Sequence, residues 1–254
     1  MIQHLENNNG TVAYQHQDGS TPGVVFCGGF RSDMSGNKAR YLDDYCQRQG
    51  WQYTRFDYRG HGQSSDDFTN CGIDTWLEDT LAILDHVTVG KQIIIGSSMG
   101  LWLALLATIR RPQRIAGLLG IAGAPDFTEV LIREQLDEPT RQTLKSGGTW
   151  FRPSQYDDQS PYPITGGLLD SGRQLLLLND VINIDCPVRL IHGTGDTDVP
   201  WSLSLQVLDA IRHDDVALTL LKDSDHRLST PDELACIARQ LSDLHHRAEA
   251  SAAN

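Results

Sequence analysis

The chain of 254 residues has few cysteines, few basic residues and no long apolar runs. Its five cysteines are scattered, odd in number and never form a CxxC pair. This excludes a disulfide framework and a structural zinc site, and it predicts reduced, mostly buried thiols. Lys and Arg number 21 against 33 Asp and Glu, a formal net charge of −12. We therefore expect no nucleic-acid partner, because phosphate backbones attract clustered basic residues.

Membrane and export signals are also missing. The longest mainly apolar stretch, Met99 to Ile109, is too short to cross a bilayer. The first ten residues, MIQHLENNNG, have neither the basic-then-apolar pattern of a secretory signal nor the Arg-rich character of a transit peptide. These observations predict a cytoplasmic protein without a membrane span.

Short apolar strands alternate along the chain with helical patterns of ten to fifteen residues, which predicts an α/β fold with a mainly parallel sheet covered on both faces. One domain is expected over residues 1–254, with an active site at the carboxyl ends of the strands. The expected strands are Thr11–His16, Gly23–Cys27, Trp51–Tyr58, Lys91–Ile95, Ile115–Ile121, Val188–His192 and Val216–Leu221. The expected helices are Asn37–Arg48, Asp74–Val87, Met99–Arg110, Ser202–Arg212 and Glu233–Leu244.

One segment, about residues 125–180, departs from this alternation. It contains a weak helical pattern from Phe127 to Leu144, a Gly/Pro/aromatic stretch from Gly147 to Gly167, and a short apolar run. Because it is inserted between two predicted strands, we expect a small cap or lid over the site. The alternative is a structural excursion that does not touch the substrate.

A candidate nucleophile lies in Gly96-Ser97-Ser98-Met99-Gly100, between a predicted strand and a predicted helix. This is the G-x-S-x-G pattern in the strand–turn–helix context that it requires. Glycines two residues before and after the serine allow the strained turn to pack closely. We expect Ser98 to be the nucleophile; Ser97 is the rival, but it has no glycine at both two-residue offsets.

A serine hydroxyl needs a neighbouring base to take its proton, and the chain has nine histidines. His226 follows the last predicted strand, so it satisfies the order serine, acid, histidine that this fold uses. His61 and His192 also lie near strand ends, but both precede an acid. His226 is therefore the expected base. The remaining histidines lie before the first core strands, upstream of the serine, at a helix end or in an expected frayed C-terminal helix: His4, His16, His86, His213, His245 and His246.

The candidate acids follow predicted strands. Asp196 and Asp198 lie in the loop Gly193-Thr194-Gly195-Asp196-Thr197-Asp198-Val199-Pro200, where a carboxylate can hold the second ring N–H of the histidine. Spacing to Val199-Pro200 favours Asp196. Asp126 is a more distant candidate, and Asp225 is adjacent to His226 and poorly placed to orient its ring.

Acyl transfer also requires two donors for the oxyanion of the tetrahedral intermediate. One is expected to be the backbone N–H of Met99, the residue after the nucleophile. The other is expected from the loop after the strand Gly23–Cys27, where Gly28-Gly29 precedes Phe30. The amide of Phe30 is therefore the second candidate; the alternative is that the two glycines form a simple flexible turn.

These segments resemble those of the α/β hydrolases. Asp57-Tyr58-Arg59-Gly60-His61-Gly62-Gln63-Ser64 is similar to the family's strand-end turn, and G-S-S-M-G, H-G-x-x-D-x-x-V-P and S-D-H match its nucleophile, acid and base segments in order. The chain is identified as a member of this family over nearly its whole length. The resemblance implies the α/β-hydrolase fold, with a mostly parallel eight-stranded sheet, helices on both faces and a small cap insertion.

A further set of motifs resembles a branch of the family that comprises acyl-protein thioesterases and acyl-glucuronide esterases. This resemblance implies esterase or thioesterase activity with a compact cap, and it is weakest over residues 125–180. The motifs are Ser32-x-Met34-x-Gly36-x-Lys38-Ala39, Arg55-Phe56-Asp57-Tyr58, Cys186-Pro187-Val188-Arg189, Val199-Pro200-Trp201 and Ser224-Asp225-His226-Arg227.

The sequence thus predicts a serine hydrolase that cleaves small-molecule carboxylic esters or thioesters through an acyl-enzyme intermediate. No cofactor and no metal is expected. Carbon–carbon bond hydrolases and peptidases use the same triad and remain alternatives on this fold. A catalytically silent binding protein is the alternative from another class, although such proteins usually lack a triad residue.

Overall fold

The computed structural model describes residues 1–7, 10–153 and 161–252. Within these ranges the core is an eight-stranded sheet in which the first two strand pairings, β1–β2 and β2–β4, are antiparallel and all the others are parallel. In their order across the sheet the strands are β1 (Gln3–Asn7), β2 (Gly10–Gln17), β4 (Trp51–Phe56), β3 (Ser20–Cys27), β5 (Gln92–Ser97), β6 (Ile115–Ile121), β10 (Val188–Gly193) and β12 (Val216–Leu221). The expected mostly parallel sheet is confirmed, and β1 is an additional strand that the sequence analysis did not predict.

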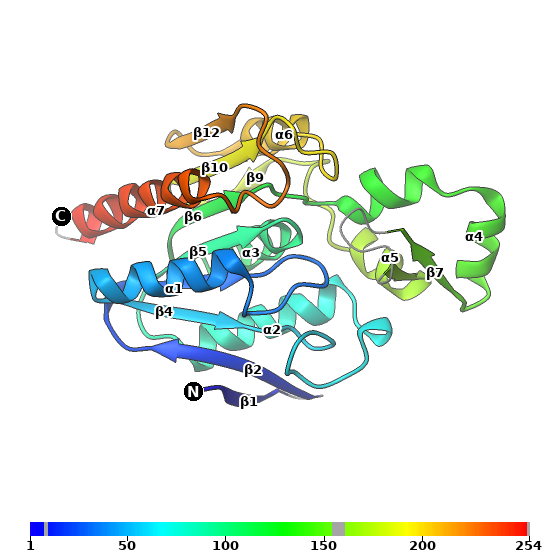
Figure 1. Ribbon diagram of the computed structural model, residues 1–254, viewed down its shortest axis with the longest axis horizontal. Coiled ribbons are helices and arrows are strands. Elements are labelled where there is room, and N and C mark those ends of the chain that lie inside the picture. The colour runs from blue at the N-terminus through cyan, green and yellow to red at the C-terminus, as the bar shows by residue number, and fades with distance from the viewer. Residues whose placement is uncertain (8–9, 154–160, 253–254) are drawn as a thin grey trace.

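Helices cover both faces of the sheet (Figure 1). One face carries α1 (Asn37–Gln49) and α7 (Pro231–Ala252); the other carries α2 (Ile73–His86), α3 (Met99–Arg110) and α6 (Ser202–Ala210). Successive side chains of a strand point to opposite faces of the sheet, so one strand contributes to the hydrophobic core on each face. Ile93 and Ile95 of β5 lie in the core with α1 and α7, and Ile94 lies in the core with α2, α3 and α6. All three isoleucines are fully buried, so β5 is a central strand.

Local sequence explains where the central helices end. α1 ends at Gly50, whose φ of 73° lies in the left-handed region that glycine adopts without strain. α3 is buried continuously from Met99 to Thr108, as its apolar sequence predicts, and it ends two residues before Pro112. The predicted boundaries of both helices are within one residue of those observed.

The segment between β6 and β9 (Ile182–Asn183) projects beside the carboxyl end of the sheet (Figure 1). The single weak helix predicted from Phe127 to Leu144 is wrong, because Asp137 starts a new helix there: it caps α4 (Glu138–Lys145) by accepting the amide of Thr140. The predicted stretch Gly147–Gly167 contains an antiparallel hairpin, and its residues 154–160 lie outside the described residues. The elements of this segment are η3 (Thr128–Ile132, a π-helical turn), η4 (Arg133–Gln135), α4, β7 (Thr149–Arg152), β8 (Tyr162–Thr165) and α5 (Gly166–Arg173).

The C-terminal helix is more ordered than the sequence analysis expected. α7 continues to Ala252, and His245 is fully buried instead of lying in a frayed end. Its ring stacks on Trp51 of β4, with centroids 3.7 Å apart and planes 6° apart. This stacking on the sheet explains why His245 is buried and not in a frayed end, because a helix packed on a sheet buries one of its faces.

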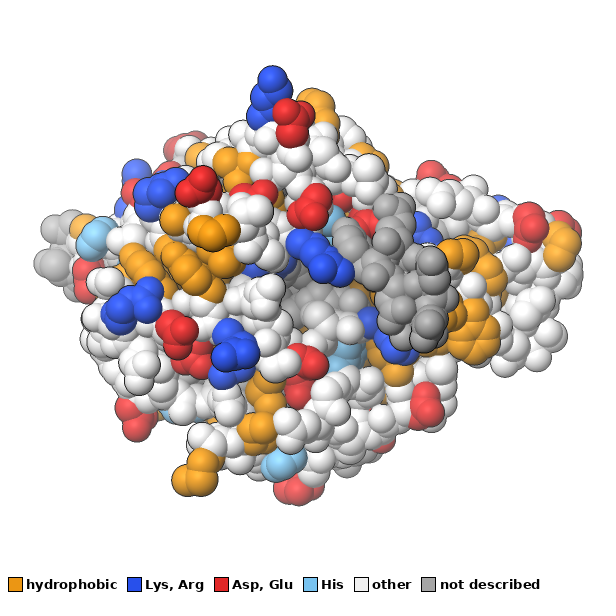
Figure 2. Space-filling view, viewed as in Figure 1, with side chains coloured by type: hydrophobic (Ala, Val, Ile, Leu, Met, Phe, Trp, Pro, Cys, Tyr) orange, Lys and Arg blue, Asp and Glu red, His pale blue; other side chains and the backbone are white. Residues whose placement is uncertain are grey.

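Smaller elements complete the fold: the single turns η1 (Phe68–Asn70) and η2 (Pro112–Arg114), and β11 (Ile211–Arg212), which pairs with β9. Figure 2 shows acidic and basic side chains interspersed over the visible face of the molecule. All five cysteines are buried and free, as predicted. Within the described ranges, no helix is both long enough and apolar enough to cross a membrane.

Candidate active site

Ser98 lies at the turn between β5 and α3, at the carboxyl edge of the sheet. Its φ of 56° and ψ of −122° place a non-glycine residue in a strained conformation, which lifts the side chain out of both elements. The backbone holds this conformation from both sides: the amide of Ser98 donates to the Ile121 carbonyl, and the Ser98 carbonyl accepts from Ala124. The strained turn that G-x-S-x-G predicts is therefore present.

The two glycines of this motif are required by close backbone contacts. A Cβ at Gly96 would lie 2.4 Å from the Gly100 carbonyl oxygen, and a Cβ at Gly100 would lie 2.1 Å from the Cys27 carbonyl oxygen. Real Cβ atoms do not approach backbone so closely. Glycine at both positions lets α3 pack directly behind the serine and against the end of β3.

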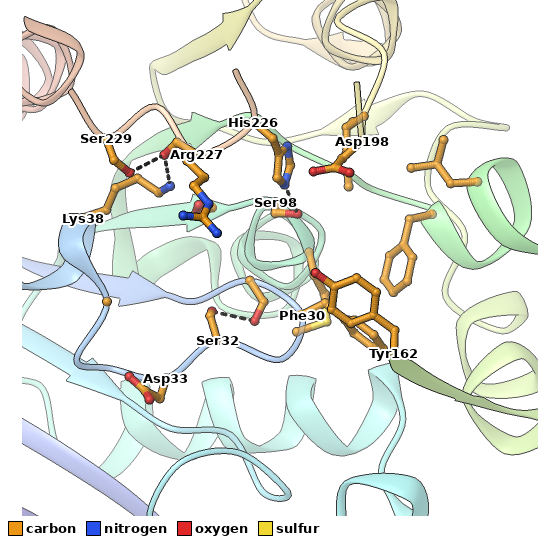
Figure 3. Close-up of a pocket in the computed structure, with 18 of the residues that line it drawn as sticks. Phe30, Ser32, Asp33, Lys38, Ser98, Tyr162, Asp198, His226, Arg227 and Ser229 are labelled. Carbon is orange, nitrogen blue, oxygen red and sulfur yellow. Dashed lines mark hydrogen bonds between the residues drawn. The ribbon is translucent and has the colours of Figure 1, made fainter. Parts of the chain in front are cut away.

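The ring of His226 lies between Ser98 and Asp196, and Figure 3 shows this ring directly above Ser98. The Nε2 atom of His226 lies 3.1 Å from the Oγ atom of Ser98, and its Nδ1 atom lies 2.7 Å from Oδ2 of Asp196. In the sequence, His226 lies 128 positions after Ser98 and 30 positions after Asp196. The parallel strands β5, β10 and β12 bring the loops of these residues together at the carboxyl edge of the sheet. The distances are those of a proton-transfer chain from a hydroxyl to a histidine held by a carboxylate.

The Asp196 carboxylate is buried and accepts four N–H donors. Oδ2 accepts from His226 and His192, and Oδ1 accepts from the amides of Asp198 and Val199, each 2.9 Å away. Burial alone would raise the pKa of Asp196, but the hydrogen bonds from His192 and His226 outweigh it and hold the pKa well below its ordinary value. The carboxylate is therefore ionised throughout the neutral pH range.

The other candidates have different surroundings. Ser97 is buried at the end of β5, and both Ser97 and Asp198 line the adjoining cavity. Asp126 is buried and accepts the amides of Leu177 and Leu178, which ties the two ends of the 125–180 segment together. Asp225 accepts the amides of the two residues after His226, so it shapes the histidine loop.

The two predicted oxyanion donors belong to segments that lie next to Ser98. Met99 is the first residue of α3, and Phe30 follows Gly29, where a Cβ would lie 3.3 Å from the Cβ of Ser98. The loop of Phe30 is held from behind by side chains that sequence reasoning did not single out for this purpose. Asp57 accepts the amide of Met34 at 2.6 Å, and Nε2 of His61 accepts the amide of Arg31 at 3.1 Å.

A cavity of about 450 Å³ opens beside Ser98. Its apolar lining includes Phe30 and Met99 from the core, and Phe127, Ile132 and Tyr162 from the 125–180 segment. The ring of Phe30 contacts those of Phe127 and Tyr162, with centroids 5.4 and 5.7 Å apart, and Figure 3 shows Phe30 and Tyr162 together below Ser98. The cavity is thus built jointly by the core and this segment, and its size suits a small-molecule ligand.

Charged groups lie at the opposite side of the cavity (Figure 3). Nζ of Lys38, in α1, donates to the Arg227 carbonyl, which also accepts the hydroxyl of Ser229 at 2.9 Å. Burial lowers the pKa of Lys38 to about 8, although the nearby carboxylates of Asp225 and Glu233 oppose this. Lys38 therefore links α1 to the backbone beside His226.

One group of potential metal ligands was found among the described residues: Asp196, Asp198 and His226 offer atoms within 4.8 Å of one another. Two of the three already serve the hydrogen-bond chain to Ser98, and the Asp196 oxygens have four N–H partners. This donor set does not fit a cation, because a metal would have to displace those hydrogens.

A family model described as alpha/beta hydrolase fold matches residues 22–145. The strand order of the sheet and the strained turn at Ser98 agree with this fold. The chain belongs to the α/β-hydrolase family. Within it, the chain is similar to the palmitoyl-protein thioesterase ABHD10, mitochondrial, of Bos taurus, with 37% identity over 92% of this chain and 76% of that protein. The expected ester or thioester hydrolase is confirmed as a class by this relative.

Two solved structures are similar over nearly their full length. Alpha/beta hydrolase domain-containing protein 10 from mouse has a TM-score of 0.89 and 36% identity, covering 96% of this chain and 98% of that one. A putative hydrolase from Agrobacterium vitis S4 has a TM-score of 0.92 and 34% identity with the same coverage. The branch of the family that the short motifs indicated is therefore confirmed.

Proposed function

We propose that Ser98 is the nucleophile of a two-step acyl transfer, with His226 as its base and Asp196 as the acid that orients the base. The observation that carries this proposal is the unbroken chain of contacts from Ser98 Oγ to His226 and on to Asp196, at 3.1 and 2.7 Å. A hydroxyl is a weak nucleophile until a base takes its proton, and this chain supplies the base at hydrogen-bond distance.

In the first step the Ser98 oxygen attacks the acyl carbonyl carbon while His226 takes the hydroxyl proton. The amides of Met99 and Phe30 donate to the resulting oxyanion, and Asp196 stabilises the imidazolium. His226 then gives the proton to the departing thiol or alcohol, leaving an acyl ester on Ser98. In the second step His226 takes a proton from water, which attacks the ester carbonyl. His226 then returns the proton to the Ser98 oxygen, and the carboxylic acid is released.

The acyl group of the substrate is proposed to occupy the cavity beside Ser98. Its apolar side is formed mainly by the side chains of Phe30, Phe127, Ile132 and Tyr162, whose hydrocarbon surface suits a hydrocarbon chain. The relative's name, palmitoyl-protein thioesterase, supports a fatty acyl thioester as the substrate class. We propose that residues 125–180 form a cap over this acyl group, because three of these four side chains belong to that segment.

The testing experiment measures hydrolysis of p-nitrophenyl esters and acyl-CoA thioesters over a series of chain lengths. Wild type is compared with Ser98→Ala and His226→Ala, and Ser97→Ala is the matched control from the same turn. Activity lost in the first two variants and kept in the third supports the serine mechanism. No turnover and no reaction with a fluorophosphonate probe, by folded wild type, would favour a silent binding protein.

The acid is tested by one pair of variants. Asp196→Asn is expected to lower kcat by several orders of magnitude, because the histidine then adopts the wrong tautomer. Asp198→Asn is expected to keep most activity, since the substitution leaves in place the backbone amide of residue 198 that donates to Asp196 Oδ1. The opposite ranking would contradict the assignment.

We also propose a reducing compartment, the cytoplasm, supported by five free buried cysteines. The relative named above as mitochondrial makes the mitochondrion the competing location. Fractionation of cells expressing the untagged protein separates the two.

A further inference from the structure

A second histidine contacts the carboxylate of Asp196. His192 lies near the end of β10, four residues before Asp196, and its side chain is fully buried. Its Nε2 atom lies 3.0 Å from Asp196 Oδ2 and 3.1 Å from the Val199 carbonyl oxygen. Its Nδ1 atom lies 2.6 Å from the hydroxyl of Ser204 in α6. The ring therefore joins a strand, the acid loop and a helix.

The surroundings of the His192 ring determine where its proton lies. A carbonyl oxygen and a carboxylate oxygen can only accept hydrogen bonds, and both lie next to Nε2. Nε2 must therefore carry a hydrogen, whichever state Nδ1 adopts. The Ser204 hydroxyl can rotate to donate to Nδ1 or accept from it, so that side imposes no conflict.

The hydrogen bonds on Asp196 are divided between its two oxygens. Backbone amides of the loop hold Oδ1, whereas Oδ2 receives N–H groups from His226 and His192. The two histidines approach the same oxygen, so His192 controls where Oδ2 lies relative to His226. Without it, Oδ2 would lose one of its two histidine N–H donors, and rotation of the carboxylate would move the base away from Ser98.

We infer that His192 is a positioning residue, which delivers a permanent N–H donor to Asp196 Oδ2 and thereby fixes the orientation of His226 toward Ser98. This inference rests on the proposed function and adds a fourth side chain to its hydrogen-bond chain. Among the described residues, His192 is not one of those that line the cavity, and its side-chain hydrogen-bond partners are Asp196, the Val199 carbonyl and Ser204, so it acts through Asp196.

Two amide variants place the N–H donor at different positions along the side chain. In His192→Gln the side-chain amide nitrogen can take the place of Nε2 and still donate to Asp196. In His192→Asn the shorter amide reaches only the Nδ1 side, toward Ser204. We expect kcat within about threefold of wild type for the first and a fall of about 10- to 100-fold for the second, with KM nearly unchanged. Lys222→Gln, at an exposed position, is the control and is expected to have the kcat of wild type.

A double-mutant cycle distinguishes action through Asp196 from a merely structural effect. The readout is the rate at which a fluorophosphonate labels Ser98, measured with each variant's melting temperature. In the Asp196→Asn background we expect His192→Asn to change the labelling rate by less than about threefold, because the residue it acts through is already disabled.

The inference would be overturned by the same fold-loss from His192→Asn in both backgrounds, or by wild-type kcat in His192→Asn. Equal losses in the Gln and Asn variants would also contradict it, since packing and not the donor would then matter. Failure of the proposed function has a different signature, namely labelling or turnover that survives in Ser98→Ala.

Discussion

Oδ1 of Asp57 accepts the backbone amide of Met34 at 2.6 Å, which joins the turn after β4 to the loop that carries Phe30. Its other oxygen accepts the amide of Gln63 at 2.8 Å. Burial raises the pKa of Asp57, and these two amides partly oppose the shift. The buried side chain of Asp57 thus fixes the loop that carries Phe30, the proposed oxyanion donor.

Asp57→Asn is expected to lower kcat by about tenfold. Asn has one acceptor oxygen, so one of the two amides would face an NH2 group and the Phe30 loop would shift from Ser98. The measurement is ester hydrolysis with the melting temperature beside it, and the exposed Asp44→Asn is the control. Unchanged kcat in a folded Asp57→Asn protein would show that this contact does not hold the loop.

Gly100→Ala is expected to destabilise the fold by more than about 2 kcal/mol, because the new Cβ would overlap the Cys27 carbonyl and force the backbone to shift. Gly167→Ala, in α5, is the matched control. Its Cβ would lie 3.9 Å from the nearest atom, so a change of about 0.5–1 kcal/mol toward greater stability is expected there. Urea denaturation checks both, and similar midpoints would contradict the steric argument.

Arg59 and Asp79 form a buried ion pair at 2.7 Å. Arg59→Leu is expected to cost about 3–5 kcal/mol of the free energy of unfolding, since it leaves the Asp79 carboxylate buried without its cationic partner. The control is Arg111→Leu, which breaks a more exposed pair with Asp85 and is expected to cost about 0–1 kcal/mol. Equal losses would show that burial of the pair is not what matters.

The pH dependence of stability should report Asp196. Its pKa is lowered in the folded protein, so folding favours the ionised form. The stabilisation is fully present above the unfolded value of 3.8 and is lost as pH falls toward the folded pKa. Asp196→Asn should therefore show a shallower fall in unfolding free energy below about pH 5 than wild type does. Parallel curves, measured by urea denaturation at each pH, would contradict the lowered pKa.

Ile132→Trp should shorten the acyl chains that the enzyme prefers. Ile132 is buried in the 125–180 segment and lines the cavity, so a larger side chain reduces the space beside Ser98. The expected result is a KM that rises for long chains and stays near wild type for acetyl and butyryl esters. Phe151→Trp, on an exposed position of β7, is the control, and an unchanged chain-length profile would place the acyl group elsewhere.

Much of this architecture was predictable because its signals are local. The apolar stretch of α3, the glycine that ends α1 and the turn at Ser98 each follow from neighbouring residues and their allowed backbone angles. The helix break at Asp137 was missed because a capping hydrogen bond competes with a weak apolar pattern, and the pattern alone does not show which prevails. The burial of His245 was missed for a related reason, since it depends on contact with Trp51, far away in the chain.

By itself, the sequence determined the fold family, the order along the chain of the proposed nucleophile, acid and base, and the need for glycine around Ser98. Only the tertiary structure decided which carboxylate lies against His226, because Asp196 and Asp198 share one loop and the side-chain directions depend on where that loop packs. Likewise, only the tertiary structure shows that His192 contacts Asp196 and that the 125–180 segment lines the cavity. These contacts join residues through packing that no local pattern encodes.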